Sequence, residues 1–271
     1  MPDALLLAAD EKVSISLQEL FHENNFRLKF TFDPVLALEW LKTRSFDLLL
    51  VPAALAFEEQ QQAGYALWES NPQASLVVYD PHDDKGLNKK KVRLSGATLI
   101  TGSRYLEYLQ RVVAKILGCS FFNKSEFSVL VVEDLDAARD IICSFVESLG
   151  YPKVLGVSSA SDALRLLEEE ASSIDCVITD ERMPNMSGHE LIEVLRGRDK
   201  FQDLPIIVLT AHGTEDCFLQ SLKVGASGFL VKPPSKSDLL RELARAMRIK
   251  NGLERTRLVE EDDIEEVMKL F

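Results

Sequence analysis

In the second half of the chain, five polar side chains follow directly after short apolar runs. Each run consists mainly of Val, Ile and Leu, which is typical of parallel strands buried on both faces. The carboxyl ends of such strands lie along one edge of the sheet, where ligands bind in open α/β folds. We therefore expect these side chains to meet at one edge. In chain order they are Glu133, Asp134, Asp180, Thr210 and Lys232.

Three carboxylates at one edge need a cation between them. Two unit charges 4 Å apart repel by about 4 kcal/mol at an effective dielectric of about 20. Hard oxygen ligands favour Mg²⁺, or Mn²⁺ in its place. Lys232 would add a fixed positive charge and Thr210 a hydroxyl donor. The central acid, Asp180, could then accept a phosphoryl group whose oxygens these groups stabilise.

Strand-like and helix-like segments alternate through the second half, which predicts a doubly wound α/β domain with a parallel sheet. Two of the helices are expected to begin at Ser-Asp pairs, Ser161-Asp162 and Ser237-Asp238. The predicted strands cover 128–132, 154–157, 175–179, 205–209 and 228–231, and the predicted helices cover 137–149, 161–170, 188–196, 215–223 and 237–250.

The first half repeats this plan. The run Leu5–Asp10 parallels the strand that leads to Glu133 and Asp134, and 46–52 parallels 174–180. We therefore predict one domain over 1–120 and a second over 125–250. An acidic tail over 251–271 follows, with Gly252 ending the last helix and one short apolar face in the tail. The tail is either a terminal helix on its own domain or a docking peptide.

The second domain resembles the receiver domains of bacterial two-component response regulators over Glu126–Lys250. The matching motifs are Val-Val-Glu-Asp ending at Asp134, Asp-x-x-Met-Pro starting at Asp180, Leu-Thr-Ala around Thr210, and Lys-Pro at Lys232. The resemblance implies two flavodoxin-like (βα)5 domains, each with a five-stranded parallel sheet of order 2-1-3-4-5.

The resemblance also implies residue roles. Asp180 would be the phosphoacceptor, and Glu133, Asp134, Asp180 and the backbone carbonyl of Arg182 would bind the metal. The remaining roles fall to residues around the phosphoryl group. Thr210 and Lys232 would bind it, Phe229 would turn inward when Thr210 shifts, and Arg182 and His212 would tune hydrolysis.

The implied function is signalling without an enzymatic or DNA-binding output in this chain. A histidine kinase or phosphotransfer protein would supply the phosphoryl group, and phosphorylation would change binding to an unknown downstream protein. The last helix–strand units would contact either that partner or a second copy of the chain.

The first domain lacks the corresponding chemistry. Pro52 or a neighbour stands where Asp180 would be, and Ala9 replaces the first acid, leaving Asp10 and Glu11. No hydroxyl matches Thr210 clearly, and Arg104 is the nearest base to the position of Lys232. The sequence therefore predicts a pseudo-receiver, kept either for protein contact or for stability alone.

Composition narrows the function classes. The net charge of −12 disfavours nucleic-acid binding, and the basic cluster at 89–93 is predicted to be a solvated turn. The four cysteines form no C-x-x-C pair, which indicates free thiols in a reducing cytoplasm. No apolar run is long enough to span a bilayer. We expect a cytoplasmic protein that binds neither nucleic acid nor membrane.

Two alternatives stay open. The two domains could be the regulatory part of a longer regulator, such as a diguanylate cyclase. The second alternative is that the chain is a Mg²⁺-dependent phosphatase with an aspartyl-phosphate intermediate. Such an enzyme would need a second Asp two residues after Asp180, and Arg182 stands there.

Overall fold

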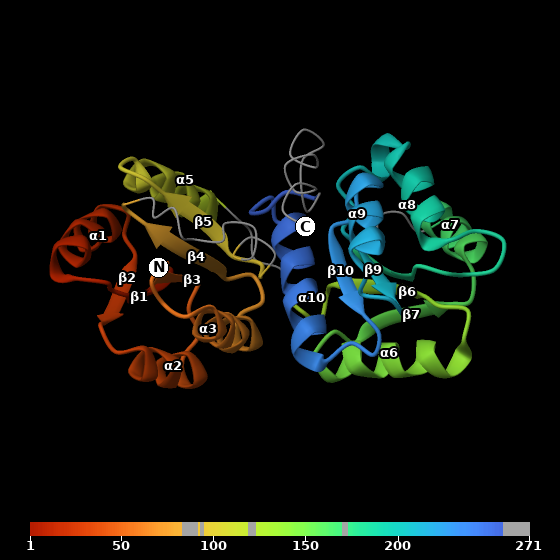
Figure 1. Cartoon of the computed structure of the whole chain (residues 1–271), viewed down its shortest axis with the longest axis horizontal. Helices are drawn as coiled ribbons and strands as arrows, with labels where there is room; N and C mark the ends of the chain where they lie inside the picture. The colour runs from red at the N-terminus through yellow and green to blue at the C-terminus, as the bar shows by residue number, and fades with distance from the viewer. Residues whose placement is uncertain (83–91, 93–94, 119–122, 170–172, 257–271) are drawn as a thin grey trace. The chain divides into compact units, whose positions relative to one another are not determined.

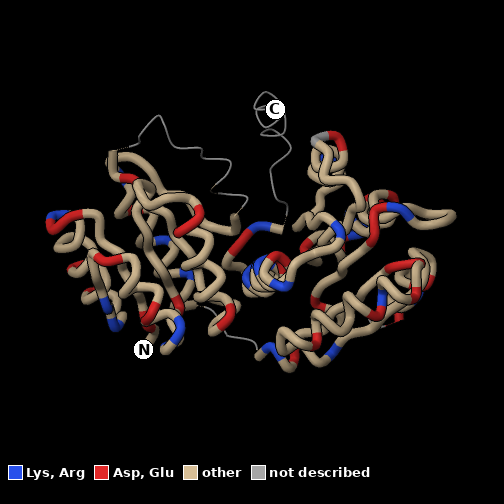
Figure 2. The backbone as a smooth tube through the Cα atoms, turned by 60° about the horizontal axis from the view of Figure 1, so that its bottom comes forward, with Lys and Arg blue, Asp and Glu red and all other residues tan. Residues whose placement is uncertain are grey.

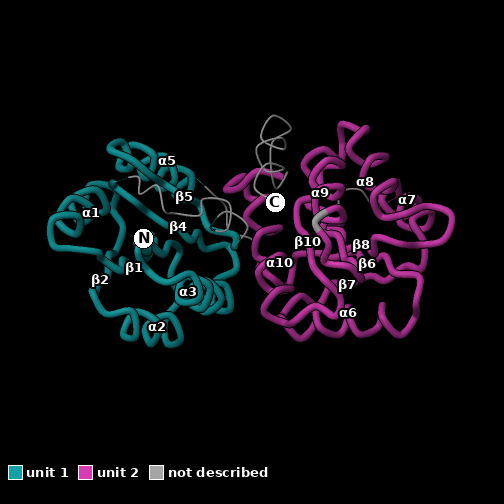
Figure 3. The backbone as a smooth tube through the Cα atoms, in the orientation of Figure 1, with its two compact units in different colours: residues 1–120 teal, residues 121–271 magenta. Residues whose placement is uncertain are grey.

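The computed structural model describes residues 1–82, 92, 95–118, 123–169 and 173–256. The chain divides into two compact units, Met1–Ser120 and Phe121–Phe271 (Figure 3). Acidic and basic residues are interspersed along the described backbone of both units (Figure 2). No helix in these described ranges is long and apolar enough to cross a bilayer.

The first unit is a five-stranded parallel sheet with helices between its strands (Figure 1). Its strand order is β2-β1-β3-β4-β5, as predicted. The strands are β1 (Asp3–Leu7), β2 (Arg27–Thr31), β3 (Leu48–Pro52), β4 (Ser75–Asp80) and β5 (Thr98–Thr101), and the helices are α1 (Glu11–Glu23), α2 (Pro34–Thr43), α3 (Phe57–Ser70) and α5 (Tyr105–Gly118).

The second unit repeats the same order, β10-β9-β8-β6-β7, which reads 2-1-3-4-5 from its own first strand and confirms the predicted fold. Its strands are β6 (Ser128–Val132), β7 (Lys153–Val157), β8 (Cys176–Asp180), β9 (Ile206–Thr210) and β10 (Gly228–Val231). Its helices are α6 (Asp136–Ser148), α7 (Ala160–Glu169), α8 (Gly188–Arg196), the 3-10 turn η1 (Asp199–Phe201), α9 (Glu215–Lys223) and α10 (Lys236–Lys250).

Alternating strand residues fill two cores, one on each face of the second sheet. Leu130 and Val132 of β6 point to the core under α7 and α8, together with Leu191 and Leu195. Val129 and Val131 point to the other face, where the core includes α6 and α10 residues such as Ile142 and Leu243. Both faces of the strands are therefore buried, which explains their continuous apolar sequences.

Three helices, α6, α7 and α10, start one residue earlier than predicted, and serine caps explain two of these starts. The hydroxyl of Ser159 accepts a hydrogen bond from the Asp162 amide at 3.1 Å, and that of Ser235 accepts one from the Asp238 amide at 3.0 Å. The capping serine accepts from the amide three residues later, so Ser159 and Ser235 are the caps. The predicted caps, Ser161-Asp162 and Ser237-Asp238, lie inside the helices, so this prediction was wrong.

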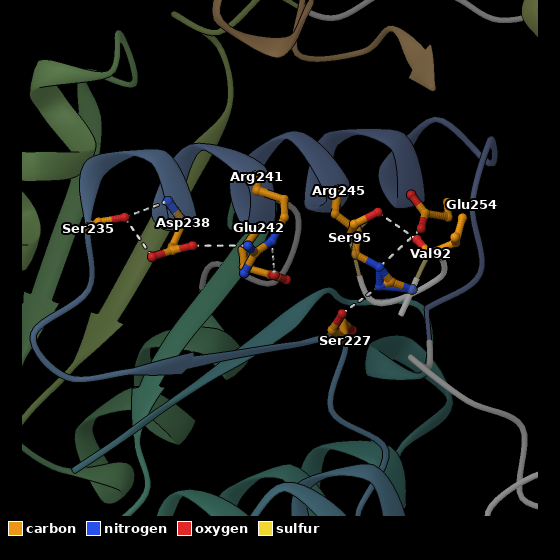
Figure 4. Close-up of polar contacts among 9 residues, drawn as sticks. All are labelled: Val92, Ser95, Ser227, Ser235, Asp238, Arg241, Glu242, Arg245 and Glu254. Atoms are coloured by element: carbon orange, nitrogen blue, oxygen red, sulfur yellow. Dashed lines mark hydrogen bonds and ion pairs between the residues drawn. The ribbon is translucent and has the colours of Figure 1, made fainter. Parts of the chain in front are cut away.

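The segment after α10 is held against that helix. Gly252 has a φ of +68°, in the left-handed region that glycine adopts readily, and it ends the helix as predicted. Glu254 then turns back and accepts bonds from Arg245 at 3.1 Å and Arg248 at 3.0 Å. Figure 4 shows Arg245 placed between Glu254 and the backbone carbonyl of Ser227, to which it donates at 2.6 Å.

Three predictions lie outside the described residues: the solvated basic turn at 89–93, the free thiol at Cys119 and the apolar face of the tail beyond 256. The other cysteines, Cys143, Cys176 and Cys217, are free thiols.

Candidate metal centre

Three predicted acids meet at the carboxyl edge of the second sheet. Glu133 and Asp134 follow β6, and Asp180 ends β8, the neighbouring strand. One carboxylate oxygen from each lies within 4.8 Å of the others. Glu133 is fully buried, Asp180 is buried and Asp134 is half-buried. Strand order thus brings together acids that are distant in sequence, because β6 and β8 are adjacent in the sheet.

Lys232 lies among these acids. Its Nζ is 2.5 Å from Oε2 of Glu133 and 2.9 Å from Oδ1 of Asp180. Burial lowers the pKa of the Lys232 ammonium, but the bonds to Glu133 and Asp180 outweigh burial and raise the pKa above its ordinary value. Lys232 therefore stays charged and offsets part of the negative charge at this edge.

The donor set fits a hard divalent cation. Oε1 of Glu133 is buried and has no hydrogen-bond partner among the described residues, although an unpaired buried carboxylate oxygen is costly. Among the described residues, Lys232 pairs with Glu133 and Asp180 but not with Asp134. Carboxylate oxygens that remain available at this spacing are the ligands that Mg²⁺ prefers, with water completing its shell. Arg182 follows in the loop after β8, and its carbonyl as a further ligand stays a prediction.

The loop after β8 is fixed closely to Asp180. The Gly188 amide donates to the carbonyl of Glu181 at 2.9 Å. A Cβ added at Gly188 would lie 2.1 Å from the backbone oxygen of Asp180, so no larger residue fits there without movement. Asn185 turns the loop with a φ of +68°. The Asp-x-x-Met-Pro…Gly pattern thus sets the backbone position from which the Asp180 carboxylate leaves the strand.

Thr210 is fully buried at the end of β9, and its hydroxyl is already engaged. It donates a hydrogen bond to the carboxylate of Glu181 and accepts one from the His212 amide at 3.0 Å. The His212 carbonyl, at 3.1 Å, is a second acceptor for the same hydroxyl. Glu181 is itself buried. The sequence analysis did not single out Glu181, although an acid directly after Asp180 was a visible signal.

The remaining predicted residues separate into two places. The guanidinium of Arg182 contacts the His212 ring, and both side chains are exposed. Phe229 is half-buried in β10, and its ring packs edge-to-face on Phe218 of α9 with centroids 5.4 Å apart. Arg182 and His212 thus lie together, whereas Phe229 lies toward α9. Their roles in switching and hydrolysis stay predictions.

Matching backbone hydrogen bonds align the two units residue by residue. The Ala53 amide donates to Tyr79 at 2.9 Å, as the Glu181 amide donates to Leu209 at 2.8 Å, so Pro52 corresponds to Asp180. The Ala8 amide donates to the strand β2 carbonyl of Thr31 at 2.8 Å, as Glu133 does to Val157 at 3.1 Å. Ala8 and Ala9 therefore stand where the second unit has Glu133 and Asp134, two of the three acids of the candidate metal centre.

This alignment corrects one expectation and agrees with another, that no hydroxyl and no base stand where the second unit has Thr210 and Lys232. The first acid is replaced by Ala8, whereas Asp10 is the N-cap of α1 and accepts from Val13 at 2.8 Å. The Gly102 amide donates to the Asp80 carbonyl at 2.9 Å, as Lys232 does to Thr210 at 2.7 Å. Gly102 therefore stands in the place of Lys232, and Asp80 in the place of Thr210.

A tyrosine closes the equivalent edge of the first sheet. The Tyr79 hydroxyl donates to the Leu7 carbonyl and accepts from the Ala9 amide, both at 3.0 Å. Burial raises the pKa of this phenol far above its ordinary value. A neutral phenol thus holds the end of β1, where the second unit carries acids.

Comparison with known proteins identifies the family. The sequence model described as the response regulator receiver domain matches residues 129–244. A chemotaxis protein CheY homolog of Campylobacter jejuni subsp. jejuni is 35% identical over 105 residues, which cover 39% of this chain and 80% of that protein. This chain belongs to the response regulator receiver family. The matched receiver domain lies in the second unit and contains every residue of the candidate metal centre.

The chain is also similar to a larger regulator and to a solved structure of similar length. The response regulator protein FleR of Pseudomonas aeruginosa is 38% identical over 117 residues, which are 43% of this chain and 24% of FleR. The receiver match therefore spans about a quarter of that relative. A solved structure titled "Structure of probable two-component system response regulator/GGDEF domain protein" is 19% identical and aligns over 92% of this chain and 99% of its own, with a TM-score of 0.44.

Proposed function

We propose that Asp180 accepts a phosphoryl group from a phosphohistidine of a histidine kinase or phosphotransfer protein, and that the chain then signals through protein contacts. The observation that carries this proposal is the grouping of Asp180 with Glu133, Asp134 and Lys232 at one sheet edge. An exposed acid would have neither a fixed counter-charge nor neighbouring acids suited to a cation.

The proposed transfer needs little from the protein beyond position and charge. An oxygen of the Asp180 carboxylate attacks phosphorus, a P–O bond forms, and the P–N bond to the donor histidine breaks. The electron pair of that bond returns to the imidazole nitrogen. A divalent cation held by Glu133, Asp134 and Asp180 would supply charge stabilisation to the phosphoryl oxygens.

The chain's own groups stabilise the product. Lys232 is 2.9 Å from the Asp180 carboxylate and can pair with a phosphoryl oxygen bound there. Thr210 can donate its hydroxyl once that hydroxyl leaves Glu181. Phe229 would respond to the movement of Thr210, and Arg182 with His212 would tune hydrolysis of the phosphoaspartate. In this proposal the chain is a phosphoacceptor that loses its phosphoryl group slowly, and it does not act as an enzyme.

The first unit is proposed to act by contact only. Pro52 offers no carboxylate, and Ala8 and Ala9 offer no metal ligands at its sheet edge. It shares the fold of the second unit without the groups that phosphorylation needs. We assign it the role of a pseudo-receiver that binds a partner protein.

Labelling with a small phosphodonor tests the proposal. The full chain is incubated with acetyl phosphate and Mg²⁺, and the mass increase of one phosphoryl group is measured. Asp180→Asn should abolish it, and the exposed-site control Asp140→Asn should leave it unchanged. Labelling that survives Asp180→Asn would reject the assignment.

One alternative has support from the comparisons. Because the receiver match spans 24% of FleR, receiver domains of this kind also occur within longer regulators. The two units would then regulate a further module, such as a cyclase. Sequencing the gene past the codon for Phe271 decides between the two arrangements.

A further inference from the structure

The Thr210 hydroxyl is proposed to bind a phosphoryl group on Asp180, but in this structure it is bound elsewhere. Its hydroxyl donates to the carboxylate of Glu181, the residue directly after Asp180. We infer that Glu181 is a positioning residue that holds the Thr210 hydroxyl in the unphosphorylated state and so sets how readily the receiver switches. This inference rests on the proposed function of Asp180.

Thr210 cannot donate to Glu181 and to a phosphoryl oxygen at the same time. A threonine hydroxyl has one hydrogen to donate. While that hydrogen is bonded to Glu181, it is not available to a phosphoryl oxygen on Asp180. The bond that the Thr210 oxygen accepts is a separate matter. The His212 amide donates to that oxygen at 3.0 Å and can do so whichever group the hydroxyl hydrogen is bonded to. Phosphoryl binding by Thr210 therefore requires the bond to Glu181 to break.

Glu181 has little freedom to follow Thr210. Its amide donates to the Leu209 carbonyl at 2.8 Å, and its carbonyl accepts from the Gly188 amide at 2.9 Å. The side chain is only 9% exposed. With its backbone bonded on both sides and the residue buried, Glu181 is held near β9, and Thr210 loses this bond when it turns toward Asp180.

Losing this bond opposes switching. A hydrogen bond to a charged acceptor is worth enough that its loss corresponds to a factor of about ten or more in an equilibrium constant. When Thr210 turns away, the Glu181 carboxylate also stays buried without that donor, which adds to the cost. Glu181 therefore favours the unphosphorylated arrangement, although it is neither a predicted metal ligand nor a predicted phosphoryl-binding residue.

Replacing Glu181 tests the inference through the affinity for beryllofluoride, used as a phosphoryl mimic. Dissociation constants are measured by fluorine NMR titration of the full chain with Mg²⁺ present. Glu181→Met removes the carboxylate acceptor at similar length and leaves only the neutral His212 carbonyl, 3.1 Å from the hydroxyl. Binding should then tighten about ten-fold. Glu181→Gln keeps an acceptor oxygen without the charge, and its gain should be smaller. The exposed residue Glu193 provides the control, because Glu193→Met removes a charge from α8 without touching Thr210.

A double-mutant cycle separates the hydrogen bond from a simple charge effect. In a Thr210→Val background there is no donor to release, so Glu181→Met should give no gain. Melting curves confirm that each variant is folded. A gain that persists with Thr210→Val, or no gain with Glu181→Met alone, would overturn the role of Glu181. Wild-type binding that is absent, or unchanged by Asp180→Asn, would instead reject the proposed function on which the inference rests.

Discussion

Pro52 in the first unit occupies the sheet position that Asp180 occupies in the second. The same backbone hydrogen bond follows each of them, from Ala53 to Tyr79 and from Glu181 to Leu209. The loss of chemistry in the first unit is thus a change of side chains on a retained backbone.

This relationship predicts that one substitution cannot restore phosphorylation of the first unit. Pro52→Asp would place a carboxylate at the sheet edge, but Ala8, Ala9 and Gly102 supply neither metal ligands nor an ammonium. In the Asp180→Asn background, Pro52→Asp should therefore leave labelling by acetyl phosphate at background. Intact-mass spectrometry measures this, and a phosphorylated double variant would contradict the prediction.

Magnesium should stabilise the second unit through its acids. A ligand that binds only the folded state at 100 times its dissociation constant adds about 2.7 kcal/mol to the free energy of unfolding. Asp134→Asn removes one of the three acids and should reduce this gain. Thermal melting with Mg²⁺ and with a chelator measures the difference. Asp140→Asn should retain the full gain, and equal gains for the wild type and Asp134→Asn would refute the metal assignment.

Glycines at the two ends of α8, its first residue Gly188 and its C-cap Gly197, should respond differently to alanine. Gly188→Ala places a Cβ 2.1 Å from the Asp180 carbonyl and should lower the free energy of unfolding by about 1–3 kcal/mol, with reduced labelling of Asp180. Gly197→Ala meets its nearest atom at 3.5 Å, with a φ of −72° that alanine adopts readily. It should be neutral or stabilise by about 0.4–1 kcal/mol. Urea unfolding compares the two, and similar losses for both would contradict this contact.

His189 should make stability depend on pH. Burial lowers the pKa of this imidazole, although the charges of Glu181 and Glu193 act to raise it. Its Nε2 lies 2.9 Å from the Ser221 hydroxyl, which joins α8 to α9. Because the unfolded chain binds the proton more tightly, stability is present above about pH 6.5 and is lost as the pH falls toward the folded-state pKa.

The measurement for His189 is the urea midpoint between pH 7.5 and pH 5.5. His189→Gln keeps a polar group near Ser221 but does not titrate, so its midpoint should fall less than that of the wild type. An identical slope in both proteins would show that His189 does not carry the dependence.

Much of the fold followed from the sequence because its signals are local. Gly188–Arg196 was bounded correctly, since Ser187 caps the helix and bonds reciprocally with Glu190. The strand at 205–209 was one residue early, because hydrogen bonding to β8 and not apolarity sets its ends.

The grouping of the acids could be predicted from strand order, but the hydrogen bonds within the site could not. Adjacent parallel strands bring Glu133 and Asp180 together whatever the loops do. The bond between Thr210 and Glu181 depends on side-chain direction across two strands, which spacing does not reveal. The misplacement of Asp10 arose because an acid was matched to an acid, whereas Asp10 caps α1, so the alignment slipped by one residue at Ala8.

The bond pair made by Glu254 has a mechanical consequence. Arg245 and Arg248 bind this residue from successive turns of α10, so the backbone at Glu254 is tied to that helix. Two residues later the Thr256 hydroxyl donates to the Asp203 carboxylate at 3.4 Å. A displacement of α10 would therefore pull on Glu254 and strain the bond that Thr256 makes to Asp203.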